Sequence, residues 1–132
     1  MLHVPTIYIA SSPLGGRGVF IGEDLPLGSM IEICPVIILS KKDRKIIHKT
    51  GLHDYYFLWG KKEKKAAIAL GYGSLYNHSY RPNAQLRSDV PARQFIIESL
   101  KPIKAGEEIT LNYNGGDDQS RLWFDTKKDP SH

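Results

Sequence analysis

The segment from 76 to 83, YNHSYRPN, concentrates side chains that could take part in chemistry. It holds two asparagines, two tyrosines and a histidine. Asn, Ser and Pro are turn formers, so one interpretation is a well-ordered surface loop. Loops on a rigid scaffold also carry binding and catalytic residues. Asn77 and His78 are therefore candidates for hydrogen bonds to a ligand or to the backbone.

A glycine-rich segment, SSPLGGRGVF (11–20), comes directly before a strand-like run. Gly15, Gly16 and Gly18 would let the backbone approach a ligand closely. The segment does not match the dinucleotide fingerprint, because no helix follows it. A flexible hairpin entry is the alternative interpretation.

Aromatic residues stand where they could face a ligand. Tyr113 ends the strand-like run in GEEITLNYNGGDD (106–118), so its hydroxyl would lie at a strand edge facing the following loop. HDYYFLW (53–59) packs four aromatic residues into one short run. Core packing is one explanation, and the other is that Tyr55 or Tyr56 lines a channel for a cationic side chain.

The histidines and the single cysteine argue against several kinds of site. His3, His48, His53 and His132 show no spacing typical of metal ligands, so we expect no metal site. Cys34 is the only cysteine, which argues against a disulfide framework and fits a reducing compartment. No pattern supports a Ser–His or Cys–His nucleophile.

The composition fits one globular domain over residues 1–132. With 41% hydrophobic residues, a chain of this length can build a core without disulfides. No run approaches the ~18 apolar residues that a membrane span needs, and the N-terminus lacks a basic start. We expect no membrane contact and an intracellular protein, cytoplasmic, or nuclear if it acts on host chromatin.

The net charge of +4 is unevenly distributed. Residues 41–65 hold nine Lys or Arg against three acidic residues, a net charge of +6, so the remainder carries −2. Basic clusters beside an aromatic run can meet nucleic acid or another anionic partner. Solvated loop faces are the simpler interpretation of such runs.

Short β-like runs separated by Pro and Gly must position these side chains. They lie at 6–10, 18–22, 30–39, 93–100 and 108–113, and they predict a mostly β domain with little helix. Pro35 should interrupt or bulge its run, because it cannot donate to a ladder. The best helical candidate is 41–58, capped by Ser40 and weakened by Gly51.

Two segments share one local pattern. Residues 25–33 and 101–111 each place a Pro, then a Gly, then a strand-like run containing Ile. Gly28 and Gly106 are therefore expected to have positive φ in tight turns that enter strands.

Taken in order, GRGVF (16–20), YNHSYRPN (76–83) and GEEITLNY (106–113) resemble the signature of the SET-domain protein lysine methyltransferases. The resemblance runs from about Pro5 to Tyr113. Because the chain lacks cysteine-rich flanks, it looks most similar to the minimal stand-alone viral SET protein and to similar bacterial proteins. The resemblance implies a fold of small curved sheets, with a pseudoknot-like threading of the chain after the last strand.

The resemblance also implies roles for individual residues. The cofactor would be S-adenosylmethionine, held by Gly16, Arg17 and Gly18 and by the pair Asn77 and His78. Tyr113 and Tyr55 correspond to the catalytic positions. The lysine channel would be lined by Tyr55, Tyr56, Tyr76, Trp123 and Phe124.

The implied activity is methyl transfer to a lysine of a protein substrate, with a histone as one candidate. Contact with nucleic acid would then be only indirect or weak. The tail 113–132 or a second copy in a homodimer would complete the site. Two alternatives stay open: a SET-like binding module that has lost catalysis, and a small basic β-domain that binds nucleic acid through residues 41–65.

Overall fold

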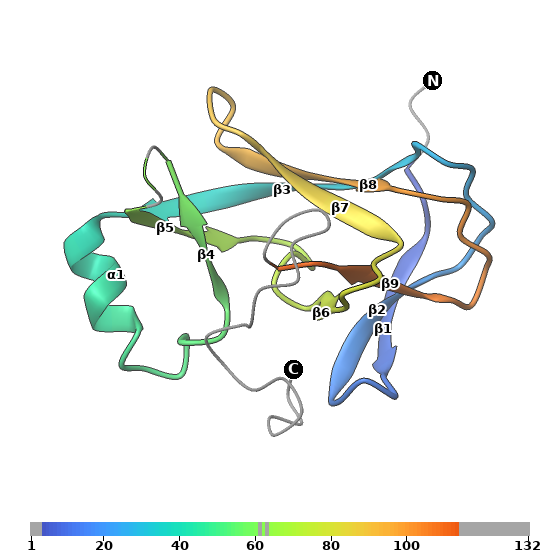
Figure 1. The fold of residues 1–132 in the computed structure, drawn as a ribbon, viewed down its shortest axis with the longest axis horizontal. Coiled ribbons are helices and arrows are strands. Elements are labelled where there is room, and N and C mark those ends of the chain that lie inside the picture. The colour runs from blue at the N-terminus through green and yellow to red at the C-terminus, as the bar shows by residue number, and fades with distance from the viewer. Residues whose placement is uncertain (1–3, 61, 63, 114–132) are drawn as a thin grey trace.

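The computed structural model describes residues 4–60, 62 and 64–113. Two β-sheets and one short helix account for the regular structure of these residues. The expectation of a mostly β domain with little helix is confirmed. In Figure 1 one sheet extends from α1 across the upper part of the molecule, and the other lies at its opposite end.

The first sheet holds the segments that the sequence singled out. Its order is β1-β2-β9-β6, and its strands are β1 (Ile7–Ser11), β2 (Arg17–Ile21), β9 (Glu108–Leu111) and β6 (Asn77–His78). β6 pairs with β9 in parallel, with Asn77 opposite Thr110. This pairing places the YNHS segment beside the end of GEEITLNY, although they are distant in sequence.

The second sheet is antiparallel and has the order β4-β5-β3-β8-β7. Its strands are β4 (Tyr56–Trp59), β5 (Lys65–Ala69), β3 (Met30–Leu39), β8 (Gln94–Ser99) and β7 (Ala84–Asp89). The expectation that Pro35 interrupts or bulges its strand is wrong. Pro35 lies where the pairing of β3 passes from β8 to β5, and the register shift lies between Met30 and Glu32.

The helix α1 (Lys41–Ile47) is shorter than the sequence predicts. The Ser40 cap is confirmed, because its side chain accepts a hydrogen bond from the Asp43 N–H over 3.1 Å. Turns follow, and the aromatic run that the prediction placed in the helix forms β4 instead. Aromatic residues favour strands, and β4 gains hydrogen bonds by pairing with β5. A longer helix would gain little, because α1 buries none of its residues against the rest of the protein.

The two similar turns lie side by side. Gly28 has φ +80° and Gly106 has φ +91°, as predicted. A β-bridge joins the two segments: the Leu25 N–H donates to the Ile103 carbonyl over 2.7 Å, and the Ile103 N–H donates back over 2.9 Å. Residues 22–29 connect β2 of the first sheet to the second sheet, and residues 100–107 lead back from the second sheet to β9. The bridge therefore joins two of the connections between the sheets.

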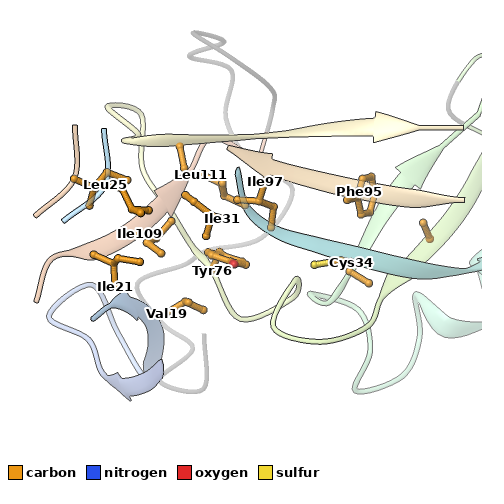
Figure 2. Close-up of a cluster of buried hydrophobic side chains, with 14 of the residues drawn as sticks. Val19, Ile21, Leu25, Ile31, Cys34, Tyr76, Phe95, Ile97, Ile109 and Leu111 are labelled. Carbon is orange, nitrogen blue, oxygen red and sulfur yellow. The ribbon is translucent and has the colours of Figure 1, made fainter. Parts of the chain in front are cut away.

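The core lies between the sheets. Its members come from both of them and from the connecting turns, and they include Val19, Ile21, Leu25, Ile31, Cys34, Phe95, Ile97, Ile103, Ile109 and Leu111. Figure 2 shows the Tyr76 ring in the middle of this cluster, among side chains of both sheets. Tyr76 thus carries the segment before β6 into the core and fixes where β6 begins.

The predicted threading of the chain after β9 lies outside the described residues, as do Trp123, Phe124 and the tail from 114 to 132. Among the described residues, no helix has the length and apolar character to cross a membrane.

Candidate active site

The parallel pairing of β6 with β9 brings Tyr113 against the YNHS segment. The Tyr113 N–H donates to His78 Nδ1 over 3.1 Å, and the ring centroids lie 5.2 Å apart. The Tyr113 hydroxyl donates to the Tyr76 carbonyl. Residues 76–78 therefore hold Tyr113 at both its backbone and its hydroxyl.

The surroundings of Tyr113 keep its hydroxyl protonated. Burial raises the pKa of this phenol well above its ordinary value, and negative charge at Glu108, Tyr55 and Asp54 raises it further. A neutral phenol can donate its proton to a carbonyl and still accept a hydrogen bond with its oxygen. The group is thus suited to orienting a ligand and unsuited to removing a proton at neutral pH.

The alternation of side chains along β4 decides which aromatic residues reach Tyr113. The ring of Phe57 meets the ring of Tyr113 edge to face at 6.3 Å. Tyr55 lies in the turn before β4, close enough to Tyr113 to interact electrostatically with its hydroxyl, and its backbone carbonyl accepts a hydrogen bond from Ser74 Oγ over 2.9 Å. Tyr56 takes the opposite side, where its hydroxyl lies 2.8 Å from His48 Nδ1. Of the two predicted channel tyrosines on this run, only Tyr55 joins the cluster.

Tyr76 contributes its backbone carbonyl to the cluster around Tyr113. Its ring is in the core, and its hydroxyl donates to Glu32 Oε1 over 2.7 Å. Glu32 Oε2 accepts the Tyr72 N–H over 3.0 Å. Burial, and then the charge of Glu32, raise the pKa of the Tyr76 hydroxyl. The Glu32 carboxylate thus anchors the segment whose carbonyl meets Tyr113.

The glycine-rich turn is bonded to the same segment through Asn77 and Glu108. Asn77 Nδ2 donates to the Arg17 carbonyl over 3.0 Å and to Glu108 Oε2 over 2.7 Å. Ser12 Oγ donates to Glu108 Oε1 over 2.6 Å. A Cβ at Gly18 would overlap Glu108 Oε2 and would lie 2.9 Å from Asn77 Nδ2, so a side chain here would displace these two hydrogen-bonded groups. Gly16 has φ +56°, a conformation that also favours glycine.

The second asparagine of YNHSYRPN is Asn83, and it also bonds to β9. Its Nδ2 donates to the Glu108 carbonyl over 2.8 Å, and its Oδ1 accepts the Thr110 N–H over 2.9 Å. The two asparagines therefore fasten both ends of the segment to β9. Turn chemistry and hydrogen-bonding side chains occur together because the segment must be fixed in place.

Sequence reasoning missed three residues of this site. Phe57 could have been identified from the two-residue alternation of a strand if its run had been assigned to a strand instead of a helix. Glu108 was visible as the second acid of GEEITLNY, but its bonds to Ser12 and Asn77 depend on tertiary contacts. Asn83 gave only a turn signal, and its burial comes from packing against β9.

Residues 16–114 match the SET domain family. The chain belongs to the SET-domain family. A protein of Schizosaccharomyces pombe named histone-lysine N-methyltransferase, H3 lysine-37 specific, is 37% identical over 111 residues, covering 83% of this chain and 71% of that relative. A protein of Cryptococcus neoformans named histone-lysine N-methyltransferase, H3 lysine-36 specific, is 30% identical over 107 residues, covering 75% of this chain and 13% of that relative.

Solved structures agree with this family. A crystal structure of a Plasmodium falciparum protein described as a histone methyltransferase has a TM-score of 0.64 and 32% identity, and covers 82% of this chain and 96% of that one. A structure of the Chaetomium thermophilum Polycomb Repressive Complex 2 has a TM-score of 0.68 at 18% identity, covers 84% of this chain and 15% of that one, and is evidence for the fold alone.

The family and these relatives support an S-adenosylmethionine-dependent protein lysine methyltransferase, which favours the enzyme over the two alternative interpretations. SET methyltransferases in general use this cofactor. The expected particular likeness to viral and bacterial SET proteins is not confirmed, because the matching histone methyltransferases described above are eukaryotic.

Proposed function

We propose that this chain transfers a methyl group from S-adenosylmethionine to a lysine side chain of a protein, with Tyr113 as the residue that orients the lysine amine. The observation that carries the proposal is the neutral Tyr113 hydroxyl, which donates to the Tyr76 carbonyl beside Tyr55 and Phe57. Aromatic walls and one oriented hydroxyl suit an amine at the end of a long aliphatic stem.

The glycine-rich turn and the pair Asn77–His78 are suited to holding the cofactor. A Cβ at Gly18 would overlap Glu108 Oε2, and Asn77 Nδ2 donates to the Arg17 carbonyl, so the glycine-rich turn lies against Asn77 of β6. The His78 ring is flanked by the Tyr80 ring at 4.3 Å, edge to face, and by the tilted Tyr113 ring at 5.2 Å, an aromatic cluster against which a purine could pack. When bound, the cofactor supplies a methyl group on a sulfonium.

The chain's own residues must deliver a neutral amine in line with that methyl group. A free lysine has a pKa near ~10.4, and a dry aromatic site lowers that pKa because it disfavours the ammonium. Since the pKa of Tyr113 is raised, Tyr113 does not act as the base. Its oxygen accepts an N–H of the amine while its own O–H donates to the Tyr76 carbonyl. The nitrogen lone pair is thereby held at roughly 3 to 3.5 Å from the carbon it attacks.

The other predicted channel residues divide by position. Tyr55 and Phe57 form the wall that contacts the lysine stem, and Tyr76 contributes its carbonyl. Tyr56 faces α1, so we assign it no part in the channel. Trp123 and Phe124 stay predictions for the lid. We also propose that residues 1–132 act as one SET domain, with the tail or a second copy in a homodimer completing the channel.

The test is incubation of the chain with methyl-labelled cofactor and a panel of basic proteins that includes histones, followed by mass spectrometry of modified lysines. The relatives' names make histones the first candidates. We expect label on a lysine of at least one protein. Calorimetry with the cofactor alone separates two failures. No label and no uptake of the cofactor would contradict the activity, whereas uptake without label would contradict only the substrate class.

A further inference from the structure

The cations of the basic segment from 41 to 65 are not used by the proposed active site, which takes only Tyr55 and Phe57 from this segment. Its first part forms α1 and the turn after it. The exposed residues Lys41, Lys42, Lys45 and Lys49 gather there, with Arg44 partly buried and Asp43 the one acid of the helix. In Figure 1, α1 lies at the outer end of the second sheet beyond β4 and β5, while β6 and β9 belong to the other sheet. We call these five cations the basic face.

The local structure does not require this charge. Arg44 and Lys45 are in the last turn of α1, where cations stabilise the helix dipole. Lys41 and Lys42 are in the first turn, where the dipole disfavours cations. Lys41 and Lys45 are four residues apart on one face and repel each other. The arrangement therefore costs stability unless an anion lies against it.

The basic face also has a concave part. A surface pocket of about 280 Å³ is lined by Arg44, Lys45, His48, Lys49 and Tyr56. Two of its lining side chains are joined there, with the Tyr56 hydroxyl 2.8 Å from His48 Nδ1. Three cationic side chains around one hollow suit an anionic group that keeps some of its water, such as a phosphate.

The dimensions fit a polyanion with closely spaced charges. A helix of seven residues is about 10 Å long. Duplex DNA carries about six phosphate charges over that length of its axis. Lysines suit such a partner, because they act as mobile point charges on phosphates.

We infer that the basic face formed by Lys41, Lys42, Arg44, Lys45 and Lys49 binds the phosphate backbone of duplex DNA to which the protein substrate is attached. The choice of DNA over an acidic protein rests on the proposed function. A histone tail is cationic, so the basic face repels the tail itself, and the anionic component of the same target is the DNA. The surface would thus hold the enzyme on its target while the tail enters the channel.

The test measures binding of a fluorescent 30-base-pair duplex by anisotropy at several salt concentrations, without cofactor or protein substrate. We compare the chain with the variant Lys45→Gln/Lys49→Gln and with a control of equal charge change, Lys101→Gln/Lys104→Gln, whose two lysines are exposed elsewhere. Two lost phosphate contacts should weaken binding at least ~10-fold near 100 mM salt and lower the slope of log K against log salt by about 1.8. The control should change binding less than ~3-fold, the residual expected from net charge alone. Thermal unfolding should show all three proteins folded.

Three results would overturn the inference. One is no duplex binding above background, and another is equal weakening by the two double variants. The third is tighter binding of a labelled polyglutamate peptide than of the duplex, which would assign the surface to an acidic protein. Since this assay contains no cofactor, its failure is distinguishable from a failure of methyl transfer: lysine methylation without duplex binding would leave the proposed function standing and remove only this surface.

Discussion

The cluster around Tyr113 and the basic face of α1 are built on opposite principles. The cluster is held by short hydrogen bonds to carboxylates and carbonyls, and its key hydroxyl is neutral. The basic face is exposed, has no buried residue on α1, and consists of like charges. Function in the first region depends on the position of single atoms, and function in the second depends on how many charges are present. The first should be insensitive to salt and intolerant of small changes, and the second should show the reverse.

The strongest test of this contrast is Gly18→Ala. The added methyl overlaps Glu108 Oε2 and crowds Asn77, so the Glu108 carboxylate must shift and its hydrogen bonds to Ser12 and Asn77 are disturbed. We expect cofactor affinity to fall at least ~100-fold, with ~1–3 kcal/mol of lost stability from overpacking. Calorimetry and thermal denaturation measure both. Gly51→Ala is the matched control, because nothing lies within 4 Å of a Cβ there and its φ is ordinary. Cofactor binding unaffected by Gly18→Ala would show that the tight turn has no part in the site.

A smaller change tests the anchor behind Tyr76. Glu32→Gln keeps the shape but removes the charge that accepts the Tyr76 hydroxyl and the Tyr72 N–H. Charged acceptors bond more strongly than neutral ones, so the Tyr76 carbonyl should become less well fixed. We expect kcat to fall about 10-fold, equivalent to ~1.4 kcal/mol, with KM nearly unchanged. The control is Glu98→Gln, which weakens the partly exposed pair with Arg87 and the contact with Gln85, both made with β7 at the edge of the second sheet. If both variants lower kcat equally, the anchor has no specific role.

The pH dependence should show that Tyr113 stays neutral. Burial and nearby negative charge raise its pKa above the usual ~10, so the phenol keeps its proton while the substrate amine loses its own. Turnover should therefore rise with pH up to about 10 without a falling limb from this tyrosine. The raised pKa contributes stability that is present below pH ~10 and is lost as the pH rises through the folded-state value. Ultraviolet titration of tyrosinate, compared with Tyr113→Phe, measures this. A phenol in that difference spectrum titrating below pH 9 would contradict it.

The smallest effect is predicted for Tyr56→Phe. Tyr56 lies on the α1 side of β4, and its hydroxyl bonds to His48, so its loss should cost about 1 kcal/mol of stability at most. Methylation of a free peptide should change less than ~2-fold, a barrier change under ~0.4 kcal/mol. Tyr55→Phe serves as the comparison, because Tyr55 faces the cluster. A larger loss of activity from Tyr56→Phe than from Tyr55→Phe would reverse the assignment of the two faces.

Local pattern predicted part of the fold. The five β-like runs correspond to β1, β2, β3, β8 and β9, and the Ser40 cap and the positive φ of Gly28 and Gly106 are confirmed. The strands that were missed have physical reasons. β4 (56–59) overlaps the end of the expected helix, and β5 (KAAIA) is mostly alanine, which has low strand propensity. β7 (AQLRSD) has little apolar character, and β6 has two residues whose pairing with β9 is long-range. A strand that exists only through a distant partner leaves no local periodicity.

The sequence indicated residues that the structure gathers into the candidate site, but it did not indicate their geometry. The resemblance named Tyr113, His78 and the glycine-rich turn, and the structure brings these close through β6 and β9. It could not show that Tyr76 acts through its carbonyl or that Glu32 anchors it, because both follow from core packing. Tyr55 and Tyr56 look equivalent in sequence, and only the strand assignment of β4 separates them.

The central claim is that the Tyr113 hydroxyl orients a neutral amine for transfer, and the most direct measurement is the single-turnover rate of Tyr113→Phe. Methyl transfer to a histone peptide would be followed at saturating cofactor, with calorimetry confirming that the variant still binds the cofactor. The account predicts a rate at least ~10-fold lower, more than ~1.4 kcal/mol of barrier, with cofactor affinity within ~2-fold of the parent. Equal single-turnover rates in the two proteins would contradict it.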